Sequence, residues 1–198
     1  MNLIRYYLIA CCLYLLGCSL PDGDHTAAVN NWFQDEAQSR GIDFLHVSGY
    51  GKQTNELALL PEIVGSGVAL VDIDSDGDLD AYFVQGGGRY TENLELREPN
   101  QLYINRGDGT FEKSVGMADR GYGMGVAVGD YDSDGDIDVY VTNVGANTLW
   151  RNDGNLKFKE VSLQAGVNDE GWGTAAAFVD ADNDGDLDLF VVNYIEWS

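Results

Sequence analysis

The chain has 198 residues, of which 44% are hydrophobic, so it is long enough and apolar enough for a packed domain and is not a disordered acidic tail. Its 33 acidic residues outnumber its 11 basic residues and give a formal net charge of −22. A surface this acidic repels phosphate backbones and anionic lipid headgroups, which argues against nucleic-acid binding and electrostatic membrane binding and favours metal ions as partners.

The N-terminus has the pattern of an export signal. Arg5 supplies a positive charge, and residues 6–16 form an apolar run that suits a signal peptide but is too short to span a bilayer. This run ends in Leu-Leu-Gly-Cys at residues 15–18, which resembles the lipobox of bacterial lipoproteins.

We therefore predict a lipoprotein-type signal peptide over residues 1–18, a lipidated Cys18, and a tether over residues 19–30. An uncleaved signal anchor and a plain secretion signal are the alternatives. Cys11 and Cys12 lie in the same segment, so the mature chain has no pair of cysteines for an internal disulfide.

The remainder, residues 31–198, is organised as repeats. Three nine-residue aspartate loops begin at Asp72, Asp130 and Asp180, and their starts lie 58 and 50 residues apart. Each loop follows a small apolar run and precedes a run of β-branched and aromatic residues, which predicts two strands around every loop. The expected strands are 65–71 and 81–84, 123–128 and 139–142, and 173–179 and 189–192.

The first two copies continue into a further hairpin. Residues 100–105 lead through a glycine turn to Phe111, and residues 147–152 lead to Phe158 with the same spacing. A unit of about fifty residues with four short strands has the size of one β-propeller blade, so we predict an all-β fold of four-stranded antiparallel blades. The first copy also carries a polar insertion over residues 86–98, in the kind of loop where specificity often resides.

Each aspartate loop has the donor pattern of a calcium site. Positions one, three, five and nine offer carboxylates, position seven offers its backbone carbonyl, and glycine at position six permits the sharp turn. Hard oxygen donors in this number favour calcium over zinc. We expect about three Ca²⁺ sites and a disordered loop without the ion, because two like charges at ~4 Å repel by on the order of 4 kcal/mol at an effective dielectric of about 20. The predicted metal residues are Asp72, Asp74, Asp76, Asp78, Asp80, Asp130, Asp132, Asp134, Asp136, Asp138, Asp180, Asp182, Asp184, Asp186 and Asp188.

Two alternatives to a calcium site fit part of this pattern. An EF-hand needs a bidentate glutamate at the twelfth position inside a helix, but Phe83, Val141 and Val191 stand there in expected strands, which also excludes a dockerin pair. A solvated acidic turn without a metal is the second alternative, and three full matches with glycine in place argue against it.

The loops, the glycine-rich lead-in strands and the Asn-x-Leu-aromatic-x-Asn hairpins together resemble the FG-GAP or VCBS repeat class of calcium-binding β-propellers, over roughly residues 30–198. A narrower resemblance to the cartilage acidic protein type rests on residues 41–46, 60–63, 121–130 and 193–198. The resemblance implies a propeller, loop calcium and an extracellular location, but no known activity. A propeller closes with four to eight blades, so three loops predict an incomplete propeller of about three blades that ends in or before completion of the third.

Some residues imitate functional motifs. Arg106-Gly107-Asp108 spells an adhesion tripeptide, but it occupies the hairpin turn where the next copy has Asp153-Gly154, so turn chemistry explains it.

The histidines and tryptophans also have structural explanations. His25 and His46 are too few and too isolated for a zinc site, and we expect them in the tether and on a strand or loop surface. Trp150 and Trp172 are expected to pack between blades rather than to bind sugar.

These patterns predict an exported calcium-binding module, either a cell-envelope lipoprotein at the outer membrane or surface, or a secreted protein. It would bind a protein or glycan partner on the propeller face without catalysis and would contact the membrane only through the Cys18 lipid. The alternative is the propeller domain of a secreted carbohydrate-active enzyme, a lyase or hydrolase whose active site lies outside this fragment. The carboxylates to test for that alternative are Glu56, Glu62, Glu92 and Glu95.

Overall fold

The computed structural model describes residues 33–49, 57–91 and 93–195. The chain divides into two compact units, Met1–Asp35 and Glu36–Ser198, and all described helices and strands lie in the second. The predicted signal peptide, Cys18, the tether and His25 lie outside the described residues, as do Glu56 and Glu92. Within the described ranges, no helix is both long enough and apolar enough to cross a bilayer.

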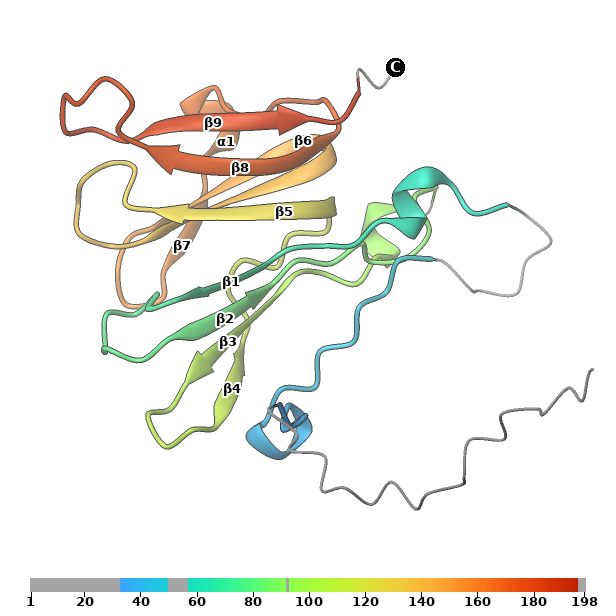
Figure 1. The fold of residues 1–198 in the computed structure, drawn as a ribbon, viewed down its shortest axis with the longest axis horizontal. Helices are drawn as coiled ribbons and strands as arrows, with labels where there is room; N and C mark the ends of the chain where they lie inside the picture. The colour runs from blue at the N-terminus through green and yellow to red at the C-terminus, as the bar shows by residue number, and fades with distance from the viewer. Residues whose placement is uncertain (1–32, 50–56, 92, 196–198) are drawn as a thin grey trace, which may run out of the picture. The chain divides into compact units, whose positions relative to one another are not determined.

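The second unit is built from antiparallel sheets, which confirms the predicted all-β fold (Figure 1). The sheets contain four, three and two strands, in the orders β1-β2-β3-β4, β5-β6-β7 and β8-β9. The helical elements of the described chain are single turns. The strands are β1 (Val68–Val71), β2 (Asp80–Phe83), β3 (Gln101–Asn105), β4 (Phe111–Ser114), β5 (Tyr122–Gly129), β6 (Asp138–Asn152), β7 (Phe158–Glu160), β8 (Gly173–Val179) and β9 (Asp188–Asn193), and the turns are η1 (Gln38–Arg40), η2 (Leu60–Ile63), η3 (Leu94–Leu96) and α1 (Ser162–Ala165).

The aspartate loops join equivalent strands in all three sheets. The last residue of the lead-in strand pairs with the ninth loop residue in each copy: Val71 with Asp80, Gly129 with Asp138, and Val179 with Asp188. The three loops therefore project from the same end of their sheets, as Figure 1 shows.

The second sheet differs from the prediction in one respect. The two strands expected at 139–142 and 147–152 form one continuous element, β6. The chain turns within it at Gly145, whose φ of 99° suits glycine, and the backbone N–H of Asn143 donates to Oδ1 of Asn147 at 2.7 Å. The first half of β6 pairs with β5 and the second half with β7, so this blade still has four extended segments. In the first blade the 86–98 insertion takes the place of this tight turn.

The apolar core lies between successive sheets. One cluster joins Tyr82 and Leu102 of the first sheet to Val139 and Val141 of the second. Another packs Tyr140 of the second sheet against partly buried residues of the third, among them Phe178 and Leu189. Each of these aromatic and aliphatic side chains buries apolar area that contributes about 1.5–3 kcal/mol when fully covered. The sheets therefore stack as blades.

Glycine in the lead-in strands lets neighbouring blades approach closely. A methyl group added at Gly125 of β5 would lie 2.7 Å from the carbonyl oxygen of Thr174 in β8. One added at Gly67 would lie 3.1 Å from the Cα of Gly125. Gly67 and Gly125, the second glycines of their Gly-x-Gly pairs, are thus required by packing between the lead-in segments of neighbouring blades. Strands rather than helices follow these pairs, which excludes a phosphate-binding loop.

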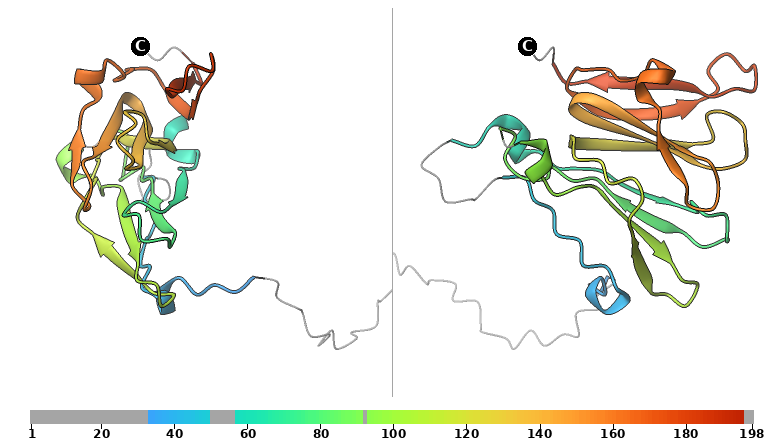
Figure 2. Two further views of the ribbon diagram at one scale, coloured as in Figure 1. Left: turned by 90° about the vertical axis from the view of Figure 1, so that its left-hand side faces the viewer. Right: turned by 180° about the vertical axis from the view of Figure 1, so that it is seen from behind.

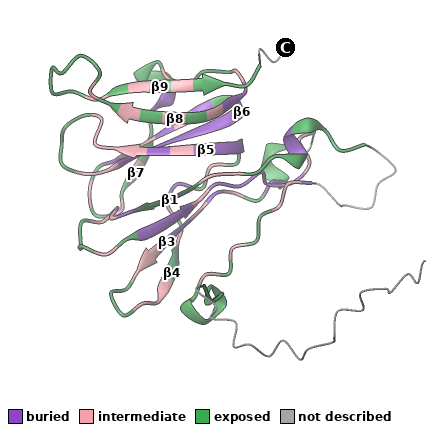
Figure 3. Ribbon diagram, in the orientation of Figure 1, coloured by how far each residue is buried: buried purple, intermediate pink, exposed green. Residues whose placement is uncertain are grey.

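The third sheet exposes positions that are buried in the other two. Tyr82 and Tyr140 are each 0% exposed, whereas Phe190 at the same repeat position is 54% exposed. Val84 and Val192 show the same contrast. Figure 3 shows the buried residues concentrated in the first two sheets and β9 largely accessible. The outer face of β8 and β9 is therefore an uncovered blade face.

Residues 42–48 pack against the outer face of the first sheet. The Phe44 ring stacks on Phe83, with centroids 4.7 Å apart and an interplanar angle of 18°. The Tyr103 hydroxyl donates to Oδ1 of Asp43 at 2.5 Å, and the backbone N–H of Val47 donates to the side chain of Gln85 at 2.6 Å. This segment covers the outer residues of β2 and β3, of which Ala81 and Tyr103 are buried and Phe83 is half-buried.

Candidate metal centre

The first aspartate of each loop organises the turn. Oδ1 of Asp72 accepts the N–H of Asp76 at 3.0 Å, and Oδ2 accepts the N–H of Gly77 at 2.9 Å. Gly77 has a φ of 95°, so a glycine at position six meets a real backbone requirement. Asp130 and Asp180 make the corresponding pairs of bonds at 3.0–3.1 Å. The same local geometry therefore recurs three times.

The ninth aspartate anchors the loop to the blade. In the first copy, Asp80 accepts the N–H of Ile73 at 2.9 Å and the N–H of Asn105 at 2.7 Å, and it is fully buried. The Asn105 side chain explains why the hairpin asparagine recurs with the loop, because its Nδ2 donates to the carbonyl of Leu79 in the loop at 3.2 Å and its Oδ1 accepts the N–H of Gly107 in the hairpin turn at 3.1 Å.

The second and third copies show what this anchor needs. Asp138 accepts the N–H groups of Tyr131 at 3.0 Å and Asn152 at 2.9 Å and is also fully buried. Asp188 accepts the N–H of Ala181 at 3.0 Å and is exposed. Among the described residues, the third loop therefore has the local bond without a hairpin bond.

The structure brings three carboxylates together in every loop, with one oxygen from each residue within 4.8 Å of the others. Positions one, three and nine converge in the first two loops, whereas positions one, three and five converge in the third. The groups are Asp72, Asp74 and Asp80; Asp130, Asp132 and Asp138; and Asp180, Asp182 and Asp184. The other predicted residues lie in the same loops but outside these groups: Asp76, Asp78, Asp134, Asp136, Asp186 and Asp188.

Burial and mutual repulsion raise the proton affinity of these carboxylates. Burial is the main cause that raises the pKa of Asp138 to about 6, and the charges of Asp132 and Asp134 add to it, while two backbone N–H donors oppose it. Burial likewise raises the pKa of Asp80 and Asp74 in the first loop. A positive ion between the carboxylates would relieve both effects.

One atom in the first loop tests whether a cation fits. Oδ1 of Asp74 is buried, and no described residue donates a hydrogen bond to it. A buried carboxylate oxygen without a donor is costly unless a cation satisfies it. The donors of all three groups are carboxylate oxygens, which suit calcium or magnesium better than zinc. The three groups can therefore hold hard metal ions, and calcium is compatible with them.

Asn152 connects the first two loops, which the sequence did not reveal. Its side-chain Nδ2 donates to the carbonyl of Ile73 in the first loop at 2.9 Å and to that of Ile137 in the second at 3.3 Å. Its backbone N–H donates to Asp138. A residue 79 positions from Ile73 thus joins the two sites, a contact that only the stacking of blades creates.

The adhesion-like tripeptide is a hairpin turn, as predicted. Gly107 has a φ of 72°, and Oδ1 of Asp108 accepts both the N–H and the hydroxyl of Thr110. These bonds lower the pKa of Asp108. Arg106 pairs with Glu112 at 2.5 Å across the turn.

The tryptophans pack in the core, as predicted. Trp172 is buried with Tyr122 and Val144, and Trp150 packs against the cluster between the first two blades. His46 lies on an exposed loop, so its predicted surface position is also confirmed.

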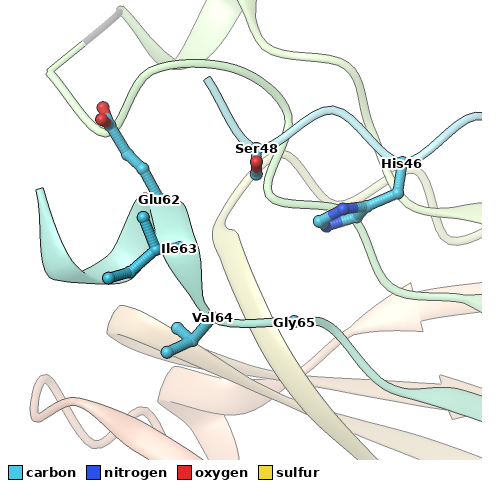
Figure 4. A pocket seen from close by; sticks show the side chains of 6 residues that line it. All are labelled: His46, Ser48, Glu62, Ile63, Val64 and Gly65. Atoms are coloured by element: carbon cyan, nitrogen blue, oxygen red, sulfur yellow. The ribbon is translucent and has the colours of Figure 1, made fainter. Parts of the chain in front are cut away.

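His46 and Glu62 line a pocket of about 510 Å³ (Figure 4). Glu62 is 1% exposed and accepts the N–H groups of Leu59 at 3.1 Å and Tyr90 at 3.0 Å, so this candidate acid is bound into the backbone. Nε2 of His46 lies 2.9 Å from Oγ of Ser66, whose hydroxyl donates to a backbone carbonyl at 3.0 Å. The hydroxyl proton is therefore directed away from the histidine, which is not the arrangement of an activated nucleophile.

Of the remaining candidate carboxylates, Glu95 lies exposed in η3. Its backbone N–H donates to Oδ1 of Asn93 at 3.2 Å, and this bond begins the helical turn.

Stacked antiparallel sheets that each carry an oxygen-donor loop at the same end define a propeller-like repeat protein with candidate metal sites. The family model of the FG-GAP-like repeat matches residues 72–141 and 130–191, which together span more than half of the chain. The protein therefore belongs to the FG-GAP-like repeat family. No curated protein matches it.

Proposed function

We propose that this protein is a calcium-binding FG-GAP repeat module of the cartilage acidic protein type, in which calcium stabilises the blades. The observation that carries the proposal is the buried Oδ1 of Asp74, which lacks a hydrogen-bond donor among the described residues and lies in an all-oxygen cluster. The recurrence of the same turn geometry in all three copies supports one ion in each loop. Calcium suits a cluster of protein carboxylates better than magnesium because calcium takes about six to eight oxygen ligands in flexible geometry, whereas magnesium demands a near-ideal octahedron and usually keeps several waters.

The proposed role of the ion is structural. The loops connect the two innermost strands of every blade, and the ninth aspartates of the first two copies tie the loop to a third strand. An ion with an affinity of about 0.1 mM, at about 1 mM free calcium, would contribute about 1.4 kcal/mol per site. Three sites would then contribute about 4 kcal/mol, a large part of the stability of an ordinary domain.

Calcium binding is tested by thermal melting and by a count of bound ions. The full chain is dialysed against a chelator and then melted in calcium, in magnesium at the same concentration, and in neither. We expect a clear rise in Tm with calcium, a smaller rise with magnesium, and about three bound calcium ions per chain by equilibrium dialysis. An unchanged Tm in calcium would contradict the proposal.

We further propose that the protein is exported and anchored in the cell envelope through a lipid on Cys18. The basic residue, the apolar run and the cysteine at the lipobox-like position support this location. Mass spectrometry of protein from the native host should find diacylglycerol on Cys18 at the mature N-terminus. Cleavage at another bond, with Cys18 removed or unmodified, would support plain secretion instead.

In this setting the propeller face serves as a non-catalytic binding surface for a protein or glycan. The acidic loops occupy one end of the blades, and the 86–98 insertion lies at the other end, so the two ends have different chemistry (Figure 2). Glu62 is held by two backbone donors and is an unsuitable general acid or base for the enzyme alternative.

A further inference from the structure

A second pocket, of about 550 Å³, lies at the end of the blades opposite the aspartate loops. Its wall includes Tyr122, which begins β5, and Gly145, where β6 turns, while the loops follow the other ends of these strands. The insertion after β2 contributes Tyr90 and Arg97, and the segment before β5 contributes Arg120. A concave site of this size is typical of small-ligand binding.

Comparison of successive repeats shows which contacts in this pocket recur from blade to blade and which occur in this pocket alone. One carboxylate accepts a glycine N–H and an asparagine Nδ2 in two successive copies, so these bonds belong to the blade design. The two sets are Asp119, Gly121 and Asn143, and Asp169, Gly171 and Asn193.

The arginines do not follow the repeat. Arg120 aligns with Glu170, which follows Asp169 in the next copy, so blade architecture does not require a positive charge there. Arg97 comes from the insertion, which the second blade replaces with the tight turn at Gly145. Both arginines are thus additions to this one pocket.

The two arginines are positioned by direct contacts. Arg97 is 7% exposed, donates to the carbonyl of Tyr90, and holds its guanidinium carbon 5.8 Å and 5.6 Å from the ring centroids of Tyr90 and Tyr122. Arg120 is exposed and donates to the carbonyl of Arg97. The buried cation and the exposed cation therefore share one wall of the pocket, in a chain that carries a net charge of −22.

We propose that this pocket binds a glycan that contains a uronic acid, with the sugar carboxylate paired to Arg120. Arg97 holds Arg120 at the wall of the pocket, because its backbone carbonyl accepts a hydrogen bond from the Arg120 guanidinium. Guanidinium groups suit carboxylates because they offer two parallel N–H donors. This inference rests on the proposed binding function and names the class of its ligand.

Asp119 explains why the ligand should be a sugar acid rather than a highly charged polymer. Its two oxygens each accept one hydrogen bond within the blade and retain lone pairs for hydroxyl donors. A ligand with one carboxylate and several hydroxyl groups satisfies both Arg120 and Asp119. A second carboxylate close to the first would be repelled by the negative charge of Asp119. The partly exposed Tyr90 offers an apolar surface to a sugar ring.

The test is calorimetric titration of the calcium-loaded full chain with a hyaluronan tetrasaccharide, which contains glucuronate. Chitotetraose serves as the neutral control and hexaglutamate as an acidic-peptide control. Arg120→Gln removes the pairing cation, and Arg106→Gln removes a charge of the same sign from the β3–β4 turn at the loop end. Ala146→Phe fills the pocket from an exposed position without altering either arginine.

We expect the tetrasaccharide to bind, Arg120→Gln to weaken it about tenfold or more, Ala146→Phe to abolish it, and Arg106→Gln to leave it unchanged. If the tetrasaccharide binds Arg120→Gln and Ala146→Phe as tightly as the wild type, the assignment of this pocket as the glycan site is wrong, while the proposed binding function stands. Binding of hexaglutamate but not of the sugar would overturn the ligand class. If neither binds while calcium still raises the Tm, the pocket inference fails and the calcium proposal stands.

Discussion

Replacement of Asp138 by asparagine is the most informative perturbation of the metal centre. Asp138 is fully buried, belongs to the second carboxylate group, and accepts hydrogen bonds from the N–H groups of Tyr131 and Asn152. Asparagine has nearly the same shape but carries no charge and offers only one acceptor oxygen. The substitution therefore separates the ionic role of the carboxylate from its role as an anchor.

Without calcium, the two effects of Asp138→Asn nearly cancel. The pKa of about 6, against an ordinary value near 3.9, means that ionised Asp138 costs the folded state about 3 kcal/mol at pH 7.5. Asparagine removes that cost, but it leaves one buried N–H without an acceptor, which costs about 1–3 kcal/mol. The calcium-free variant should therefore be as stable as the wild type or up to about 2 kcal/mol more stable.

With calcium, the variant loses a charged ligand. A hundredfold weaker site would lose nearly all of its contribution of about 1.4 kcal/mol at about 1 mM calcium. For a chain of this size that corresponds to about 3–6 °C of the calcium-induced rise in Tm, or about a third of the total from three sites.

The assay is differential scanning calorimetry of the wild type and Asp138→Asn, each with calcium and with chelator. Glu112→Gln is the matched control because it removes one exposed negative charge from β4, outside all three aspartate loops. A calcium-induced rise in Tm that is the same in Asp138→Asn and the wild type would refute the assignment of Asp138 as a ligand.

The other predictions concern pH and packing. Because the folded-state pKa of Asp138 is raised to about 6, the calcium-free protein should gain stability as the pH falls from 7.5 through 6. Calcium competes with the proton for this carboxylate, so calcium should bind the second site about tenfold more weakly at pH 5 than at pH 7. Calcium titrations at the two pH values would measure this difference. Gly125→Ala should lower the free energy of unfolding by about 1–3 kcal/mol, because its methyl group would meet Thr174, while Gly65→Ala, with nothing within 4 Å, should leave the urea midpoint unchanged. In the same assay, Tyr140→Ala should lower the free energy of unfolding by about 3–5 kcal/mol, and Phe190→Ala should lower it by less than about 1 kcal/mol. The reason is that these equivalent side chains are 0% and 54% exposed. Equal losses of stability would show that the face of the third blade is covered in solution.

Much of the fold could be predicted because the repeat unit is specified locally. Position-six glycines such as Gly77 occupy positive φ, and the expected strands around the loops agree with the observed ones to within a few residues. The prediction of two strands in place of β6 failed because a reversal at a single glycine, Gly145, leaves the residues on both sides extended. Composition alone does not distinguish a turn of this kind from a loop.

The candidate site was predictable only in part. The acidic spacing identified the three loops, but it could not show that Asp80 and Asp138 are buried and that their group differs from that of the third loop. Burial depends on the neighbouring hairpin, which is a tertiary contact. The contacts of Glu62 could not be predicted for the same reason, since only the fold brings the N–H of Tyr90 to it.

The hydrogen bonds of Asn152 couple the first two metal sites. Its amide donates to Ile73, whose N–H is bound by Asp80 of the first cluster, and its backbone donates to Asp138 of the second. Ordering of one loop by an ion therefore fixes a donor that the other loop needs, and the second ion meets a site that is already partly arranged. The two sites should fill with positive cooperativity, whereas the third loop, which has no such bridge in the described chain, should titrate independently.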